Sequence, residues 1–283
     1  MTGNLWSFIR NHLPLIALLA VIVVIAFFPP GWDWINWFRP ATLAMLSGES
    51  PYNLKGFFNP PWLLIPFIPL AFLPERVGVV VISIAYITSY IFVSRKLGAK
   101  ALTIAVLLTS PSFFYGLTFA NVDWIVALGF LMPPQIGLFF VLVKPQIGLG
   151  ISIYWLFESW RNGGVKQVVK VFFPVTIAFI FSFILYGLWP LRSQQWASNS
   201  SLWPMSIPIG LVLLTTAIRN RRRGLSIVAS PFLAPYVGVQ SWAIATLGLL
   251  PHQLETIVAV LGLWVVHIIE NEQLRMWLFG SFL

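Results

Sequence analysis

The chain has 283 residues, of which 58% are hydrophobic and 9% are charged, and it has no cysteine. Soluble domains carry roughly 25% charged residues, so this composition excludes an ordinary soluble protein and indicates an integral membrane protein. The lack of cysteine excludes disulfides, thiolate metal ligands and cysteine nucleophiles. The net charge of +9 lies in short basic clusters between apolar runs, which is typical of orienting charges in membrane proteins and not of nucleic-acid binding.

The apolar runs predict one all-α membrane domain over residues 1–283, a polytopic helical bundle with about 9–10 spans when short half-helices are counted. The first run follows a single arginine and lacks a cleavage site, so we expect a retained span and not a signal peptide. The runs are residues 15–28, 60–73, 76–94, 101–117, 125–143, 146–157, 171–188, 207–217, 225–250 and 254–269.

A polar and aromatic loop, residues 29–59, follows the first run. Within it, residues 34–47 predict an amphipathic helix lying at the membrane interface. The next run, residues 60–73, carries four prolines and has roughly 14 residues, against the ~20 that a span needs. We therefore expect residues 60–73 to form a half-inserted or interfacial helix.

Three basic clusters, residues 95–100, 161–170 and 219–223, predict which ends of the helices face the cytoplasm. The loop 29–59, the turn 119–124 and the loop 189–204 then face outward. This orientation requires the stretch 122–143 to be a hairpin that turns at Pro133-Pro134. If that stretch were one span, Lys144 would be cytoplasmic; the charge pattern favours the hairpin.

Two aspartates, Asp33 and Asp123, lie on the predicted outer side. Asp33 is either an interfacial loop acid or a carboxylate held against an apolar wall, where desolvation would raise its pKa and fit it for general-base work. Asp123 follows Asn121 at a predicted helix start, where an acid complements the helix dipole and an asparagine can cap the helix.

Lys144 interrupts an apolar stretch and precedes Pro145, which ends one helix and begins another. An ammonium group fixed at such a break can reach an anion as a point charge. It can also be a snorkelling lysine at a helix end, or be neutralised by Asp33 or Asp123. Three isolated histidines, His12, His252 and His267, have no metal-ligand spacing, and there is no glycine-rich phosphate loop.

Four segments, in order, resemble glycosyltransferase family 87, membrane enzymes of the GT-C fold. The first outer loop has an early aspartate, then GESPYN (48–53) and FFNPPWLLIPFIPLAFLP (57–74), where the family has an aromatic-x-P-P run. LTFANVDWIVALGF lies where the family has a G-Q-x-N turn, with Phe119-Ala120 or nearby residues in place of Gly-Gln. VLVKPQIGLG matches its K-P-Q stretch, and ASPFLAPYV (229–237) is similar to its late S-P-x-x-x-x-Y stretch.

The resemblance implies a GT-C-like bundle that moves a hexose from a polyprenyl-phosphate donor to a glycolipid or glycan acceptor, with inversion and without a metal or other cofactor. Asp33 would be the general base, and Lys144 would stabilise the leaving phosphate. The location would be a cell membrane, such as a bacterial inner membrane, with a protein complex possible. Further donor-binding residues would be Gln146, Asn121 and Asp123, and the loop on the acceptor side would contribute Tyr52, Asn59 and Arg39.

Two other functions fit the same pattern. The departure from Gly-Gln before Asn121 and the short loops are compatible with a non-catalytic membrane subunit on this scaffold. Broken helices and a buried charge also occur in transporters, but no inverted hydropathy repeat is seen.

Overall fold

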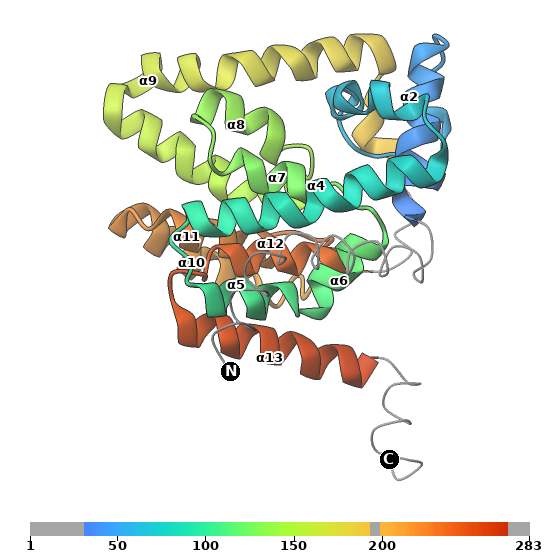
Figure 1. The fold of residues 1–283 in the computed structure, drawn as a ribbon. Helices are drawn as coiled ribbons and strands as arrows, with labels where there is room; N and C mark the ends of the chain where they lie inside the picture. Colours follow the sequence, from blue (N-terminus) through green and yellow to red (C-terminus); the bar gives the residue numbers. More distant parts are fainter. Residues whose placement is uncertain (1–30, 193–198, 271–283) are drawn as a thin grey trace, which may run out of the picture.

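The computed structural model describes residues 31–192 and 199–270, and the regular elements of this part of the chain are all helices (Figure 1). The predicted first span, residues 15–28, and His12 lie outside the described residues. The elements are η1 (Trp34–Phe38), α2 (Arg39–Leu46), η2 (Pro51–Asn53), η3 (Pro61–Phe67), α3 (Ile68–Ala71), α4 (Glu75–Lys96), α5 (Ala101–Leu108), α6 (Pro111–Thr118), α7 (Asp123–Gly129), α8 (Pro134–Val141), α9 (Pro145–Tyr186), η4 (Trp189–Arg192), α10 (Ile207–Asn220), α11 (Arg223–Phe232), η5 (Val239–Ser241), α12 (Trp242–Leu247) and α13 (Gln253–Glu270).

Three of the described helices, α4, α9 and α13, are long and apolar enough to cross a membrane. The pair α5 and α6 makes a fourth candidate if it is one span, bent by 60°. The predicted 9–10 spans also count short half-helices and the first run, which lies outside the described residues, and several apolar runs form short helices in the structure. Residues 125–143 become α7 and α8, and residues 225–250 become α11 and α12 with irregular chain between them.

Helix α9 is two helices joined at a break. Gly163 and Gly164 leave helical geometry, and Gly164 has a φ of +57°, a value that glycine adopts without a steric penalty. The arms, residues 145–162 and 165–186, diverge from this turn with α8 between them (Figure 1). The break falls within the basic cluster 161–170, between the predicted runs 146–157 and 171–188.

Helices α7 and α8 form the predicted hairpin, with its turn just before Pro133-Pro134. The two helices approach closely through glycines: a Cβ on Gly137 would lie 2.8 Å from the carbonyl oxygen of Gly129 and 2.6 Å from the ring of Trp155. Side chains at these positions would force the helices apart. The hairpin therefore returns the end of α8 to the start of α7.

The predicted helix in the loop 29–59 is present as η1 followed directly by α2. Its buried face packs on protein: the rings of Trp34 and Phe38 lie 5.6 Å and 5.9 Å from that of Phe67 in η3. The indole of Trp34 covers Gly78 of α4, where a Cβ would lie 2.4 Å from the indole nitrogen. The segment after the loop forms the short η3 and α3, in agreement with the prediction that residues 60–73 are not a full span.

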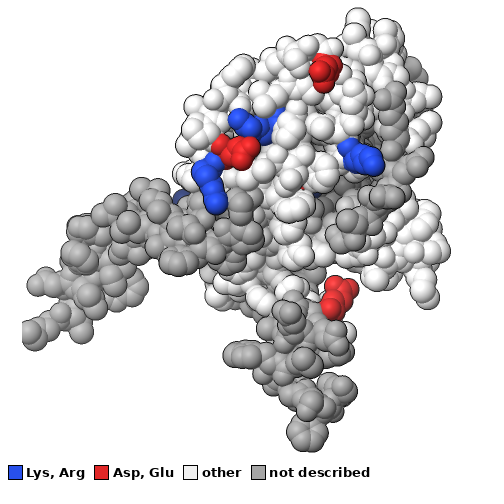
Figure 2. Space-filling model, turned by 90° about the vertical axis from the view of Figure 1, so that its right-hand side faces the viewer, with Lys and Arg blue, Asp and Glu red and all other residues white. Residues whose placement is uncertain are grey.

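The apolar helices differ in how much protein covers them. Half of the most apolar window of α4 is buried, compared with 17% for α9 and 11% for α13. Ile184 and Leu185 of α9 are 73% and 69% exposed. Uncharged residues also cover most of the described surface on the face in Figure 2. Large exposed apolar surfaces of this kind are rare on soluble monomers and are suited to contact with lipid.

Candidate functional site

Asp33 is fixed by its backbone at the point where the chain enters η1. Its backbone N–H donates to the carbonyl oxygen of Phe119 at 3.0 Å, at the end of α6. The next residue, Ala120, has a φ of +50°, so the chain turns sharply there before α7. Gly31 fits beneath this turn, because a Cβ at Gly31 would lie 2.9 Å from the Cβ of Ala120. These contacts place the Asp33 carboxylate beside the turn that leads to α7.

Asn121, which is 3% exposed, connects Asp33 to Lys144. Its Nδ2 donates to Asp33 Oδ2 at 2.5 Å, and its Oδ1 accepts from Lys144 Nζ at 2.7 Å. Oδ1 also accepts the backbone N–H of Asp123 at 3.2 Å, which is the capping contact expected at the start of α7. The ammonium group requires an oxygen in front of it, so it orients the amide with its NH₂ group toward Asp33.

Asp123 forms a buried ion pair with Lys144. Asp123 Oδ1 lies 2.5 Å from Lys144 Nζ, and the two side chains are 0% and 8% exposed. Oδ1 has no partner in hydrogen-bond geometry, so the contact is an ion pair, whereas Oδ2 accepts from Ser241 Oγ at 3.4 Å. Of the partners that the sequence left open for Lys144, the structure provides Asp123.

Asp33 is half-buried and lies outside the helices that are long enough to cross a membrane. Burial raises its pKa from 3.8 to about 6, and the Asp123 charge adds to this rise. The Lys144 charge and the Asn121 hydrogen bond lower the pKa without cancelling the effect of burial. A carboxyl group that titrates near neutral pH can accept a proton during a reaction at physiological pH.

Two further residues reach this cluster, which we define as Asp33, Asn121, Asp123 and Lys144. Tyr236 lies close enough to both aspartates that their charges raise its pKa, although burial is the larger cause. Tyr236 belongs to the stretch ASPFLAPYV (229–237), which the sequence analysis compared with an S-P-x-x-x-x-Y motif. Ser241 of η5 was missed, because a lone serine after an irregular segment carries no sequence signal for a contact with a residue 118 positions away.

Gln146, Tyr52 and Asn59 are connected to the chain on either side of Lys144. Gln146 is half-buried in the first turn of α9. The Tyr52 hydroxyl donates to the carbonyl oxygen of Asn59 at 2.9 Å, and Asn59 Nδ2 donates to that of Val143 at 2.9 Å. The loop 29–59 is thereby attached to Val143, the residue before Lys144, so Tyr52 and Asn59 help to hold the loop in place.

Arg39 lies apart from the cluster. Its guanidinium donates to the carbonyl oxygen of Ala71 at 3.2 Å and pairs with Glu75 at 3.1 Å. It therefore connects α2 to the junction of α3 and α4. The structure does not bring Arg39 together with the other predicted site residues.

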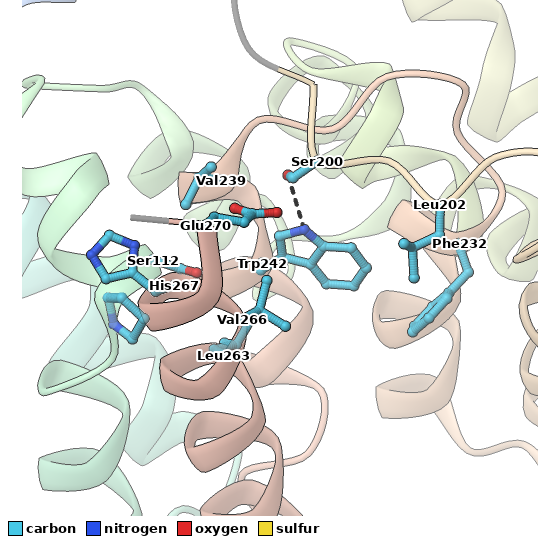
Figure 3. Close-up of a pocket in the computed structure, with 11 residues that line it drawn as sticks. Ser112, Ser200, Leu202, Phe232, Val239, Trp242, Leu263, Val266, His267 and Glu270 are labelled. Atoms are coloured by element: carbon cyan, nitrogen blue, oxygen red, sulfur yellow. Dashed lines mark hydrogen bonds between the residues drawn. The ribbon is translucent and has the colours of Figure 1, made fainter. Parts of the chain in front are cut away.

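An apolar cavity of about 240 Å³ lies on the other side of η5 from the cluster. Val239 and Trp242 line the cavity, whereas Ser241 between them contacts Asp123. Figure 3 shows Trp242 between Phe232 on one side and His267 on the other, with its indole N–H donating to Ser200 Oγ at 3.1 Å. His267 of α13 lies in the wall of the cavity.

Within residues 31–192 and 199–270, no three histidine or acidic side chains lie close enough to hold a metal ion. Comparison of the chain with family models, curated proteins and solved structures found no match. The resemblance to glycosyltransferase family 87 therefore rests on the short sequence motifs, and the site must be interpreted from its own chemistry.

Proposed function

We propose that the chain is a membrane-embedded hexosyltransferase that moves a mannose-like sugar from a polyprenyl-phosphate donor to a hydroxyl group of a lipid or glycan acceptor on the outer membrane face. The observation that carries the proposal is the half-buried carboxyl of Asp33, held by Asn121 beside a buried lysine. A carboxyl group that is held in one orientation and has a pKa near neutral is suited to act as a general base.

In this reaction the acceptor oxygen attacks the anomeric carbon of the donor while the bond from that carbon to the phosphate oxygen breaks. Asp33 takes the acceptor proton, and polyprenyl phosphate leaves with the bonding electrons. Asn121 holds the Asp33 carboxylate through Oδ2, so Oδ1 is the oxygen that meets the acceptor. Attack from the side opposite the phosphate gives inversion at the anomeric carbon.

The leaving phosphate would lie at the start of α9, near Lys144 and Gln146. A helix N-terminus stabilises anions through its free N–H groups and its dipole, and the lysine adds a full charge. Lys144 donates one hydrogen bond, to Asn121, and pairs with Asp123 outside hydrogen-bond geometry, so its ammonium group still has N–H groups for the phosphate. The isoprenoid tail would extend into lipid, and the apolar cavity behind η5 offers a second apolar surface nearby.

The test is transfer in proteoliposomes that contain the purified chain, a set of polyprenyl-phosphate hexoses and a lipid acceptor, with products identified by mass spectrometry. We expect one donor to give a product with inverted anomeric configuration. Lys144→Ala should raise the KM for the donor more than the KM for the acceptor, whereas Lys166→Ala, at an exposed position in a basic cluster, should change neither. Equal effects of the two lysine variants would contradict the donor assignment.

A second candidate function is that of a non-catalytic membrane subunit. It is favoured by the neutralisation of Lys144 by Asp123, which makes the lysine part of a buried structural pair. Under this alternative no donor in the set is consumed, and Asp33→Asn leaves the chain folded with no change in any activity of the membranes that contain it.

A further inference from the structure

A second, polar cavity lies at the tip of the α7–α8 hairpin, opposite the end that carries Asp123 and Lys144. Its volume is about 350 Å³, and its lining includes Gln135 at the start of α8 and Asn162 and Gln167 on either side of the α9 break. Helices of seven and eight residues span roughly 11–12 Å, so this cavity and the Asp33 cluster are separate.

Arg223, the first residue of α11, enters this cavity with hydrogen-bond donors that are not satisfied. Its Nε and Nη2 atoms are buried and have no acceptor within the described part of the chain. The guanidinium lies 5.6 Å from the centre of the Trp155 ring, a cation–π contact that leaves its edge N–H groups unused. Burial lowers the pKa of Arg223, and the neighbouring Tyr154 offsets this only in part. Unsatisfied buried donors on a charged group are costly, and an anion would remove that cost.

The charges around the cavity favour an anion. Arg221 and Arg222 are exposed next to Arg223, and Arg161 donates to the carbonyl oxygen of Ile218 at the end of α10. The acidic side chain in the lining, Glu158, is engaged by a hydrogen bond with Tyr154 on the same helix. The lining itself has one basic and one acidic side chain, Arg223 and Glu158, and the arginines next to Arg223 and Asn162 in the chain add positive charge.

The remaining polar lining indicates what the anion carries. Carboxamides of Gln135, Asn162 and Gln167 can each donate and accept, which suits hydroxyl groups. The planar guanidinium of Arg223 matches two oxygens of a phosphate. The volume exceeds that of a bare phosphate and accommodates a small polyol attached to it.

We propose that this cavity binds a polyol phosphate, with the phosphate on Arg223 and the hydroxyl groups on the carboxamides. The same chemistry occurs in the headgroup of a polyol phospholipid and in a free polyol phosphate. The three basic clusters lie on one side of the bundle, at the left in Figure 1, so the site faces the predicted cytoplasmic side. It is distinct from the proposed transfer site in position and in ligand.

Two binding experiments with the full-length chain separate the two sources. The first titrates glycerol 3-phosphate and inorganic phosphate into protein in detergent by calorimetry. The second compares, by native mass spectrometry, the phospholipid retained from nanodiscs of phosphatidylglycerol and from nanodiscs of phosphatidylcholine. Each uses the wild type, Arg223→Gln and the control Arg219→Gln, which removes an exposed charge from the same cluster.

Binding of glycerol 3-phosphate that weakens roughly tenfold or more in Arg223→Gln but not in Arg219→Gln supports the free ligand. Selective retention of phosphatidylglycerol, lost in Arg223→Gln, supports the lipid. If Arg223→Gln does not fold, Asn162→Ala provides the test, because it should reduce the preference for glycerol 3-phosphate over inorganic phosphate. The proposal is wrong if neither ligand binds, if the two arginine variants behave alike, or if Asn162→Ala leaves the preference unchanged.

Discussion

Replacing Asp33 with asparagine should stabilise the folded chain while it abolishes transfer. Burial raises the pKa of Asp33 from 3.8 to about 6, a difference of about 2 units. Each unit corresponds to about 1.4 kcal/mol, so ionised Asp33 lowers the stability by about 3 kcal/mol at pH 8. Asparagine carries no charge, and its side-chain oxygen can still accept from Asn121. The variant should therefore be more stable than the wild type at pH 8 by up to about 3 kcal/mol.

The pH dependence has a definite sign. Because the pKa is higher in the folded state, the contribution of Asp33 is fully favourable below pH 3.8 and is lost as the pH rises through 6. The advantage of Asp33→Asn should then fall to about half of its pH 8 value at pH 5. The difference in free energy of unfolding is measured in mixed micelles with increasing denaturing detergent. Glu49→Gln, which changes an exposed acid in the same loop, is the control. An Asp33→Asn chain that is less stable than the wild type at pH 8, or a difference that does not change with pH, would refute the reasoning.

Three further outcomes are expected. The transfer rate should fall about tenfold per pH unit below pH 6 as Asp33 becomes protonated, and a rate that is flat between pH 5 and 7 would exclude Asp33 as the base. Lys144→Met should lower the free energy of unfolding by about 3–5 kcal/mol, because it leaves the Asp123 carboxylate buried and unpaired; adding Asp123→Asn should restore part of the loss. Gly137→Ala should cost about 1–3 kcal/mol, because its Cβ would lie 2.6 Å from an indole carbon of α9, whereas Gly262→Ala faces open space and should be neutral in the same unfolding assay.

The hairpin of α7 and α8 was predictable because two local signals agreed. Pro133-Pro134 breaks any helix that approaches it. The basic clusters 95–100 and 161–170 are predicted on the same side, so the chain must cross the membrane an even number of times between them. Once the chain turns back, Asn121, Asp123 and Lys144 must lie at the same end. The helix at residues 34–46 was likewise visible in its own periodicity, although the sequence did not show that its buried face packs on η3.

The remaining features depend on packing between distant segments. The central position of Asn121 follows from the turn at Ala120, a residue that rarely adopts positive φ and gives no hint of it in the sequence. The contact of Ser241 with Asp123 depends on how η5 lies against α6 and α7. Hydropathy alone also does not show that residues 225–250 form two short helices, α11 and α12, on either side of Pro235.

The most direct test of the central claim is the transfer rate of the Asp33→Asn chain at pH 7.5, measured in proteoliposomes with the donor that the wild type uses. The proposal predicts that Asp33→Asn loses at least about 100-fold in rate, as removal of a general base does, while Glu49→Gln keeps the wild-type rate and both variants remain folded. Transfer by folded Asp33→Asn at the wild-type rate would contradict the claim that this carboxylate carries the reaction.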